Sequence, residues 1–312
     1  MDKNFVLFAG SSNATLAQEI ADYLKVPLGK IELKKFADGE NYANYLESVR
    51  GRSVYIIQST CNPANDNIME LLIMMDAARR AAAEKITCVI PYYGYGKQDR
   101  KANDREPITA KLVAKLLEAA GAHAVLALDL HADQLQGFFD IRSDFLYASG
   151  PLMTYFVQKH GKENVTVVAP DVGSSKRARA YAKMIGTDIA IIDKRRLRPN
   201  QSEVMNLVGE VKDKTALIVD DEINTGGTIV NAAKELVRQG AKEVFAMASH
   251  GVFAAEALEK LEASPLKEVI VTNSIPQTKK ISKLKVISVA PLLGEAIRRM
   301  HEKESISKIL HD

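Results

Sequence analysis

The stretch TALIVDDEINTGGTIV, residues 215–230, decides the fold of this chain. Its apolar run at 216–219 predicts a buried strand, and a helical pattern extends from Thr228 to about residue 239. A strand joined to a helix by a short turn is the repeating unit of α/β folds. Because the same unit recurs on both sides of this stretch, we expect α/β architecture throughout the chain.

The polar residues between that strand and that helix suit a phosphorylated sugar. Paired glycines allow a tight turn that presents successive backbone N–H groups, and the N-terminus of the following helix favours an anion. Asp220 and Asp221 come just before the turn, where their carboxylates could accept hydrogen bonds from sugar hydroxyls or hold a metal ion. The alternative is an ordinary strand–turn–helix joint without a ligand.

Apolar strands alternate with helical stretches along the chain, which predicts an α/β fold whose mainly parallel sheets are flanked by helices. We expect strands at 5–8, 54–58, 86–90, 125–129, 165–169, 189–193, 216–219, 244–249, 269–272 and 286–289. We expect helices at 15–24, 66–83, 108–120, 151–159, 174–185, 228–239, 254–261 and 292–301. The helix at 66–83 is apolar on most faces, which indicates deep burial or a subunit interface.

The length of 312 residues suits two domains, since about 100–200 residues per domain is usual. A break near residues 149–151 gives a first domain at 1–149 and a second at 150–290. We expect the last segment, 291–312, to form a helix and a tail that pack back on the first domain.

Composition excludes several classes of protein. The formal net charge of +3 is too small to indicate nucleic-acid binding, and 46% hydrophobic with 26% charged residues is ordinary for a globular protein. No apolar run approaches the roughly 20 residues of a membrane span, and residues 1–4 lead into a strand and not into a signal peptide. Cys61 and Cys88 lack metal-binding spacing, so we expect reduced thiols in a cytoplasmic protein.

Other polar stretches follow predicted strands, where ligands gather in open α/β sheets. PYYGYGKQDRK at 91–101 suits a nucleotide, or is a solvated loop. His131 could bind a metal or a phosphate, or be structural, and Asp171 could bind a ligand or cap a helix. Four cations within residues 194–198 could close over a polyphosphate, or form a solvated face.

Eight stretches, taken in order, resemble the ribose-phosphate pyrophosphokinase family. They are FADGE at 36–40, QSTCNPANDNIMEL at 58–71, PYYGYGKQDRK at 91–101, REPITAKL at 105–112, DLHADQLQGFFDI at 129–141, APDVG at 169–173, IIDKRRLRPN at 191–200 and VDDEINTGGT at 219–228. The resemblance covers essentially the whole chain. It implies two phosphoribosyltransferase-like domains that transfer the β,γ-diphosphoryl group of ATP to the anomeric hydroxyl of ribose 5-phosphate, which yields 5-phosphoribosyl 1-pyrophosphate and AMP for nucleotide biosynthesis.

The resemblance also implies roles for individual residues. The residues that would bind ATP are Phe36, Asp38, Gly39, Glu40, Lys97, Gln98 and Arg100. The residues that would bind ribose 5-phosphate are Arg196, Asp220, Asp221, Asn224, Thr225, Gly226, Gly227 and Thr228. His131 and Asp171 would help to place Mg²⁺, and Lys194 with Arg196 would stabilise the transferring group.

The same resemblance implies a homo-oligomer, with dimers inside a hexamer and an ATP site completed by a neighbouring subunit. The tail is similar to that of family members inhibited by ADP and activated by phosphate. Arg50, Ser305 and Ser307 are the candidate residues for this regulation.

The chain departs from the family pattern at three positions. Lys97 stands where arginine is usual, which loses a planar, stacking guanidinium. Asn224 stands where aspartate is usual, and Ser174 where glycine is usual.

Two other functions stay open. A non-catalytic regulatory homologue in a synthetase hexamer would not need Lys194 and Arg196. A phosphoribosyltransferase would share the Asp-Asp loop but would not need the nucleotide-like stretches at 36–40 and 91–101.

Overall fold

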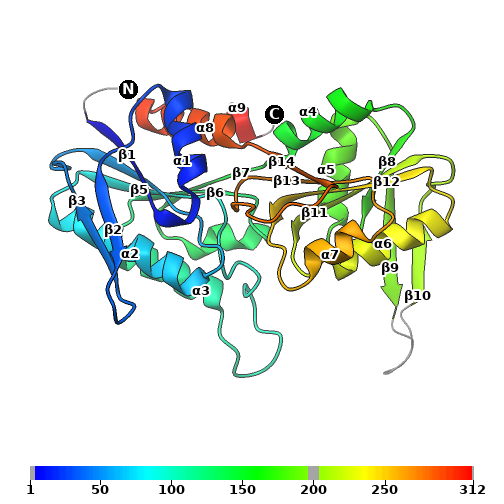
Figure 1. Ribbon diagram of the computed structural model, residues 1–312, viewed down its shortest axis with the longest axis horizontal. Coiled ribbons are helices and arrows are strands. Elements are labelled where there is room, and N and C mark those ends of the chain that lie inside the picture. Colours follow the sequence, from blue (N-terminus) through cyan, green and yellow to red (C-terminus); the bar gives the residue numbers. More distant parts are fainter. Residues whose placement is uncertain (1–3, 196–203, 311–312) are drawn as a thin grey trace. The chain divides into compact units, whose positions relative to one another are not determined.

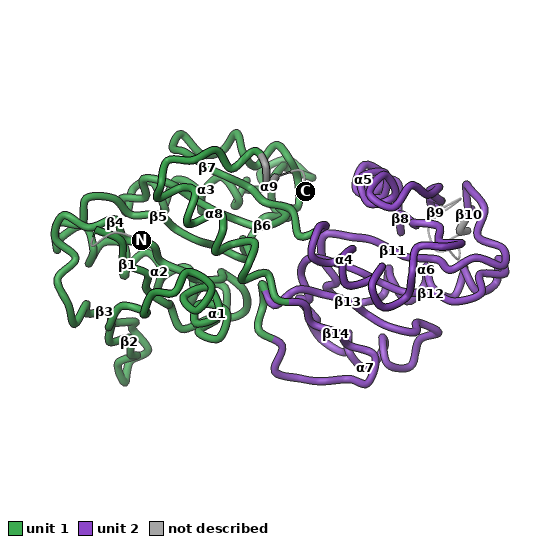
Figure 2. The backbone as a smooth tube through the Cα atoms, turned by 90° about the horizontal axis from the view of Figure 1, so that it is seen from above, with its two compact units in different colours: residues 1–148, 274–276, 288–312 green, residues 149–273, 277–287 purple. Residues whose placement is uncertain are grey.

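The computed structural model describes residues 4–195 and 204–310. The chain divides into two compact units, which Figure 2 shows in different colours. Unit 1 comprises residues 1–148, 274–276 and 288–312, and unit 2 comprises residues 149–273 and 277–287. In the described part of the chain, no helix is long and apolar enough to cross a membrane.

Unit 1 is built on a parallel sheet and a separate hairpin. The sheet has the order β1 (Phe5–Ala9), β4 (Ser53–Ile57), β5 (Lys85–Ile90), β6 (Ala124–Leu128) and β7 (Arg142–Leu146). The antiparallel hairpin consists of β2 (Ile31–Lys35) and β3 (Asn41–Tyr45). The helices are α1 (Ala14–Leu24), α2 (Ala64–Arg80), α3 (Thr109–Ala120), α8 (Ala290–Glu302) and α9 (Ser307–Leu310), with short 3₁₀ turns η1 (Ser11–Asn13) and η2 (Asp133–Phe138).

Strand alternation in unit 1 sends apolar side chains to both faces of the sheet. On one face Phe8 and Ile56 pack with Leu71 and Met74 of α2, and α3 extends the same core. The opposite face is covered by α1, which packs against α8 (Figure 1). Because burial of each such side chain contributes about 1.5–3 kcal/mol, these two layers hold the strand ends in fixed positions.

Helix α2 is buried on one side only. Leu71, Met74 and Ala78 are fully buried, whereas the side chain of Met69 is 52% exposed. Deep burial therefore holds for one side of this helix, and a subunit interface at Met69 stays a prediction.

Unit 2 is built on one seven-stranded sheet, parallel except at one edge. Its order is β10 (Val204–Val208), β9 (Ile189–Arg195), β8 (Val165–Ala169), β11 (Thr215–Ile223), β12 (Glu243–Gly251), β13 (Glu268–Thr272) and β14 (Leu284–Ile287). Only the β9–β10 pair is antiparallel among these strands. The helices are α4 (Ser149–His160), α5 (Ser175–Ile185), α6 (Gly227–Arg238) and α7 (Ala257–Glu262).

The strand order of unit 2 reverses between β8 and β11. The chain leaves β8 toward β9 and β10 on one side, and then returns to form β11 on the other side. Ligands in open α/β sheets bind beyond the carboxyl ends of the strands at such a switch point. The topology thus places Asp171, which follows β8, at the same sheet edge as the end of β11.

The predicted α/β fold is confirmed, and the differences lie in particular elements. Strand β11 was expected to end at Val219, but it continues to Ile223 because its pairing with β12 extends to Gly251. Asp220 and Asp221 therefore lie inside the strand and not after it. The hairpin β2–β3 and the strands β7 and β10 were not predicted.

Candidate functional site

Two acidic side chains lie near the end of β11, at the switch point of unit 2. The pairing of β11 with β8 stops at Ile218, whereas its pairing with β12 continues past Asp220. Asp221 is buried with 8% of its surface exposed, and Asp220 is half-buried. A buried carboxylate is costly unless it is paired or hydrogen-bonded, so this pair requires donors nearby.

Ser174 supplies donors to two of the acids in this region. Its backbone N–H donates to Asp171 Oδ1 at 3.0 Å, and its Oγ lies 3.0 Å from Asp220 Oδ1 and 3.2 Å from Asp171 Oδ1. The backbone N–H of Asp221 also donates to Asp220 Oδ1, at 3.0 Å. The sugar-binding and metal-binding candidates of unit 2 are thus linked through one serine.

The electrostatics of this group favour a ligand that brings donors or positive charge. Burial, followed by the negative charge of Asp221, raises the pKa of Asp220 to about 7, and Asp171 adds to the effect. Arg177 Nη2 lies 4.0 Å from Asp221 Oδ1, so a cation of α5 already faces the pair. Sugar hydroxyls or a metal ion would offset the remaining repulsion.

The turn after β11 leaves the start of α6 without a capping side chain. Gly226 is the N-cap with φ of +75°, and as a glycine it has no side chain to accept a hydrogen bond from the first turn. The carbonyl of Asn224 accepts a hydrogen bond from Ala254 N–H at 3.0 Å, which holds the turn in place. Uncapped N–H groups at the positive end of a helix suit a phosphate group.

Lys194 lies at the same edge of the sheet. Ile191 of β9 pairs with Ala169, the last residue of β8, and Lys194 follows three residues later. The side chain of Lys194 and the whole of Arg196 lie outside the described residues.

The FADGE stretch of unit 1 forms the turn of the β2–β3 hairpin. Phe36 N–H donates to the carbonyl of Glu40 at 2.8 Å, and Gly39 has a φ of +93°, a conformation that favours glycine. The phenyl ring of Phe36 is 47% exposed and lies 5.5 Å from the ring of Tyr42. An exposed aromatic face of this kind offers the apolar surface on which a planar ring can stack.

The FADGE hairpin and the loop at 91–101 are attached to the same first turn of α2. Lys35 Nζ pairs with Asp66 at 2.7 Å, and Asn41 Nδ2 donates to the Asp66 carbonyl at 3.1 Å. From the loop, the Tyr95 hydroxyl donates to Asn65. Two stretches that are far apart in sequence and were both predicted to bind a nucleotide thus meet at one helix N-terminus.

Comparison with known proteins decides the family. The family model described as the N-terminal domain of ribose phosphate pyrophosphokinase matches residues 5–121, and a phosphoribosyl synthetase-associated domain matches residues 195–311. The chain is 55% identical to the ribose-phosphate pyrophosphokinase of Bacillus subtilis, with 98% of this chain and 97% of that protein covered. The corresponding protein of Caldanaerobacter subterraneus subsp. tengcongensis is 54% identical, with 97% and 96% covered. This chain belongs to the ribose-phosphate pyrophosphokinase family.

A solved structure agrees with this assignment. Phosphoribosylpyrophosphate synthetase from Mycobacterium smegmatis matches with a TM-score of 0.92 and 41% identity, and the match covers 96% of this chain and 100% of that chain. Membership of the ribose-phosphate pyrophosphokinase family makes the chain a transferase of nucleotide biosynthesis with kinase-type chemistry. The match agrees with the predicted α/β fold of mainly parallel sheets flanked by helices.

The remaining ATP candidates of this family member lie on the surface of unit 1. Lys97, Gln98 and Arg100 are exposed in the loop after β5. Gln98 is fixed by its backbone and by its side chain. Its backbone carbonyl accepts a hydrogen bond from Ala110 N–H at 3.1 Å, and its side-chain Oε1 accepts one from the Thr109 hydroxyl at 2.5 Å. The loop is therefore tied to the start of α3.

His131 is exposed in the segment after β6 of unit 1. The preceding acid, Asp129, is buried and accepts a hydrogen bond from Ala148 N–H at 2.7 Å, so it supports the backbone. Within residues 4–195 and 204–310, no three His, Cys, Asp or Glu side chains are arranged to hold a metal ion.

The three regulatory candidates do not form one cluster by hydrogen bonds. Arg50 is exposed in the turn before β4, and Ser305 Oγ donates to or accepts from Ser307 Oγ at 3.1 Å. Arg299 donates to the Ser305 carbonyl at 2.9 Å. Among the described residues, no hydrogen bond or ion pair joins Arg50 to either serine.

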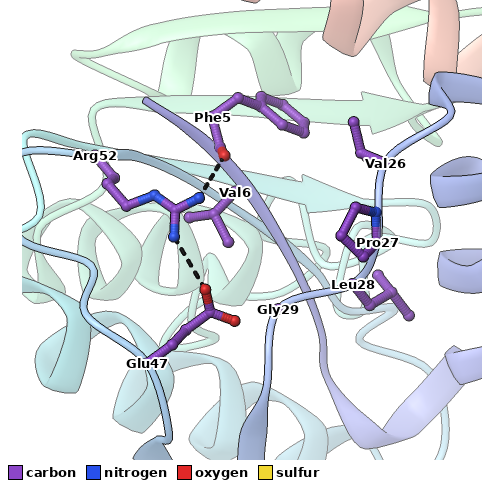
Figure 3. A pocket seen from close by; sticks show the side chains of 8 residues that line it. All are labelled: Phe5, Val6, Val26, Pro27, Leu28, Gly29, Glu47 and Arg52. Carbon is purple, nitrogen blue, oxygen red and sulfur yellow. Dashed lines mark hydrogen bonds and ion pairs between the residues drawn. The ribbon is translucent and has the colours of Figure 1, made fainter. Parts of the chain in front are cut away.

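A cavity of about 180 Å³ opens in unit 1, and none of the residues that line it is a predicted site residue (Figure 3). Phe5, Val26 and Pro27 line one side, and the Arg52 guanidinium donates to the Phe5 carbonyl at 2.8 Å and to Glu47 at 3.0 Å. It lies at the amino end of β1, whereas ligands of open α/β sheets bind beyond the carboxyl ends.

Sequence reasoning missed two residues of the site. Ser174 was noted only as a departure from the family pattern, and Arg177 was not considered. A serine before a helix usually signals a cap, so the sequence carried no signal for its contact with Asp220.

Proposed function

We propose that this chain joins the diphosphoryl group of ATP to the anomeric oxygen of ribose 5-phosphate. The anomeric hydroxyl releases its proton to solvent as its oxygen forms a bond to the β-phosphorus, the bond from that phosphorus to the α,β-bridging oxygen breaks, and AMP leaves. One observation supports the proposal most strongly. At the switch point of unit 2, the acids Asp220 and Asp221 of β11 lie just before the uncapped N-terminus of α6. One small region thus offers acceptors for sugar hydroxyls and donors for a phosphate.

The acceptor sugar occupies the end of β11 in this proposal. Asp220 and Asp221 accept hydrogen bonds from ribose hydroxyls, and the N–H groups at 224–228 surround the 5-phosphate. Asn224 brings no charge to this turn, so its amide serves the phosphate better than the carboxylate usual in the family.

The transferring group is stabilised by Lys194 and Arg196 in this proposal. Charge on the equatorial oxygens of the β-phosphorus develops in the transition state, and cations placed for it lower the barrier. The position of Lys194 at the end of β9 supports this role, because β9 ends at the same sheet edge as β8 and β11.

ATP binds unit 1 in this proposal. Phe36 stacks on the adenine, Asp38 and Glu40 accept its amino hydrogens, and Lys97, Gln98 and Arg100 approach the rest of the nucleotide. The shared attachment of the hairpin and the loop to α2 supports the placement of both stretches on unit 1, and a neighbouring subunit completes the ATP site in this proposal.

A metal ion belongs to kinase-type chemistry, and we assign it as Mg²⁺. Bound Mg²⁺ would neutralise phosphate charge during the transfer. Asp171 is the candidate ligand in unit 2 and His131 in unit 1, and the oxygen-rich group around Asp171 fits a hard cation.

The test is product analysis with purified protein, ATP, ribose 5-phosphate and Mg²⁺. We expect AMP and 5-phosphoribosyl 1-pyrophosphate in equal amounts, and neither when one substrate is left out. Formation of ADP would indicate an ordinary kinase, and a folded protein that forms no AMP would support the non-catalytic homologue. Release of pyrophosphate from 5-phosphoribosyl 1-pyrophosphate with a base would support the phosphoribosyltransferase.

Alanine substitutions at the two glycines of the turn should have different effects, one on stability and the other on sugar-phosphate binding. Gly226→Ala is expected to lower stability by about 1–2 kcal/mol, because φ is +75° and an L residue is strained there. Gly227→Ala is expected to leave stability unchanged, because an added Cβ meets nothing within 4 Å. Its methyl group would instead occupy the space of the phosphate and raise KM for ribose 5-phosphate about tenfold or more. Thermal unfolding and steady-state kinetics check both; equal effects of the two changes would contradict the assignment.

The oligomeric state, the effectors and the cellular compartment of this protein are proposed by analogy with its family. We propose a homo-oligomer of dimers within a hexamer, for which the exposed apolar side of α2 at Met69 is a candidate contact. ADP and phosphate are proposed effectors through Arg50, Ser305 and Ser307. The cytoplasm is the proposed compartment, and no role of nucleic acid or membrane is proposed.

A further inference from the structure

Ser174 stands at the N-cap of α5, yet its hydroxyl does not cap that helix. Serine is favoured at this position because its oxygen normally accepts a hydrogen bond from the first turn. Here the hydroxyl lies between two carboxylates, 3.0 Å from Asp220 Oδ1 and 3.2 Å from Asp171 Oδ1. Its usual structural role is therefore unused, and its contacts are with the site.

The two donors of Ser174 divide between the two acids. Asp171 Oδ1 already accepts the Ser174 backbone N–H at 3.0 Å. A hydroxyl has one hydrogen to donate, and donation to Asp220 gives each carboxylate one donor from the same residue. The side chain of Ser174 thus acts on Asp220, while its backbone acts on Asp171.

Two donors converge on one oxygen of Asp220. The Ser174 hydroxyl and the Asp221 N–H both lie 3.0 Å from Oδ1. This arrangement fixes the plane of the carboxylate before a ligand arrives and directs the other oxygen, Oδ2, away from these donors. A side chain fixed in advance loses less freedom on binding, which improves affinity by up to about tenfold for one side chain.

We infer that Ser174 is a positioning residue that sets Asp220 for the hydroxyls of the acceptor sugar. The inference rests on the proposed function, because it takes ribose 5-phosphate as the ligand of Asp220. It makes Ser174 a determinant of sugar affinity and leaves the nucleotide side of the reaction unaffected.

Ser174→Ala separates the two contacts, because alanine keeps the N–H that holds Asp171 and removes only the hydroxyl. We expect KM for ribose 5-phosphate to rise about tenfold at saturating ATP and Mg²⁺, with KM for ATP and kcat changed less than about twofold. The thermal shift produced by ribose 5-phosphate should shrink in parallel. The unliganded variant loses no helix cap but loses one hydrogen bond to the half-buried Asp220 carboxylate, so its unfolding temperature should fall only slightly.

Two further variants keep the inference falsifiable. Ser174→Thr retains the hydroxyl and should restore the wild-type KM for ribose 5-phosphate. Ser175→Ala makes the same change one residue later, where the side chain makes no hydrogen bond among the described residues, and should behave as the wild type.

Three outcomes would overturn the role of Ser174. They are an unchanged KM for ribose 5-phosphate in Ser174→Ala, a Ser174→Thr variant that behaves like Ser174→Ala, and an equal rise in KM for ATP. A wild-type protein without AMP formation would overturn the proposed function as well, so the two failures are distinguishable.

Discussion

Replacing Asp220 with asparagine is expected to weaken the use of ribose 5-phosphate while it stabilises the unliganded protein. A hydrogen bond to a charged group contributes about 1.5–3 kcal/mol, so kcat/KM for ribose 5-phosphate should fall roughly 10- to 100-fold. The fall should appear with the sugar phosphate as the varied substrate, because the acids of β11 belong to the acceptor side. Steady-state kinetics at pH 8 measure it.

The gain in stability follows from the pKa of Asp220, which is raised to about 7, above the value near 3.9 of an unfolded aspartate. Between these two values the folded state binds more protons than the unfolded state, so wild-type stability falls as pH rises from about 4 to 7. Because asparagine cannot ionise, the Asp220→Asn variant should not lose stability in this way as the pH rises. The unfolding temperature of Asp220→Asn should exceed that of the wild type at pH 8, and the difference should shrink at pH 5.

Asp213→Asn is the matched control, because Asp213 is an exposed acid just before the same strand. It should change neither the kinetics nor the pH dependence. An Asp220 variant that gains no stability at pH 8 relative to pH 5 would mean that the carboxylate is not held at a cost in the folded protein.

Replacing Lys194 with alanine is expected to give the largest loss of turnover. Removal of a group that stabilises transition-state charge typically costs about 100- to 1000-fold in kcat. KM for ribose 5-phosphate should change little, because the contacts of Lys194 strengthen only as the diphosphoryl group transfers. Single-turnover formation of AMP checks the chemical step itself.

Lys183→Ala is the control for this change, because it removes an exposed lysine from α5 in the same unit. It should retain wild-type turnover. A Lys194 variant with normal kcat and raised KM would reassign the residue to substrate binding.

The elements predicted from sequence are those whose apolar residues form continuous runs. Strands β6 and β8, each with all five residues buried, show this pattern most clearly. The hairpin β2–β3 was missed because IELKK and NYANY mix polar and apolar residues and none of their side chains is fully buried. Strand β7 escaped notice for the same reason, since RSDFL buries only its last residue.

The chemistry of the site was visible in the sequence, but its arrangement was not. Asp220 and Asp221 were recognised as ligand candidates, whereas the strand's continuation to Ile223 depends on its pairing with β12. Strand order is not encoded in any local pattern, so the proximity of Asp171 to Asp220 emerged only from the fold. The contact of Ser174 with both acids depends on that proximity.

The central claim is that the sugar phosphate binds at the switch point of unit 2. A crystal structure of the protein grown with ribose 5-phosphate tests this most directly. We expect the ribose hydroxyls against Asp220 and Asp221, and the phosphate at the N–H groups of residues 224–228. A sugar phosphate bound elsewhere, for example in the cavity beside Arg52, with the turn before α6 unoccupied, would contradict the account.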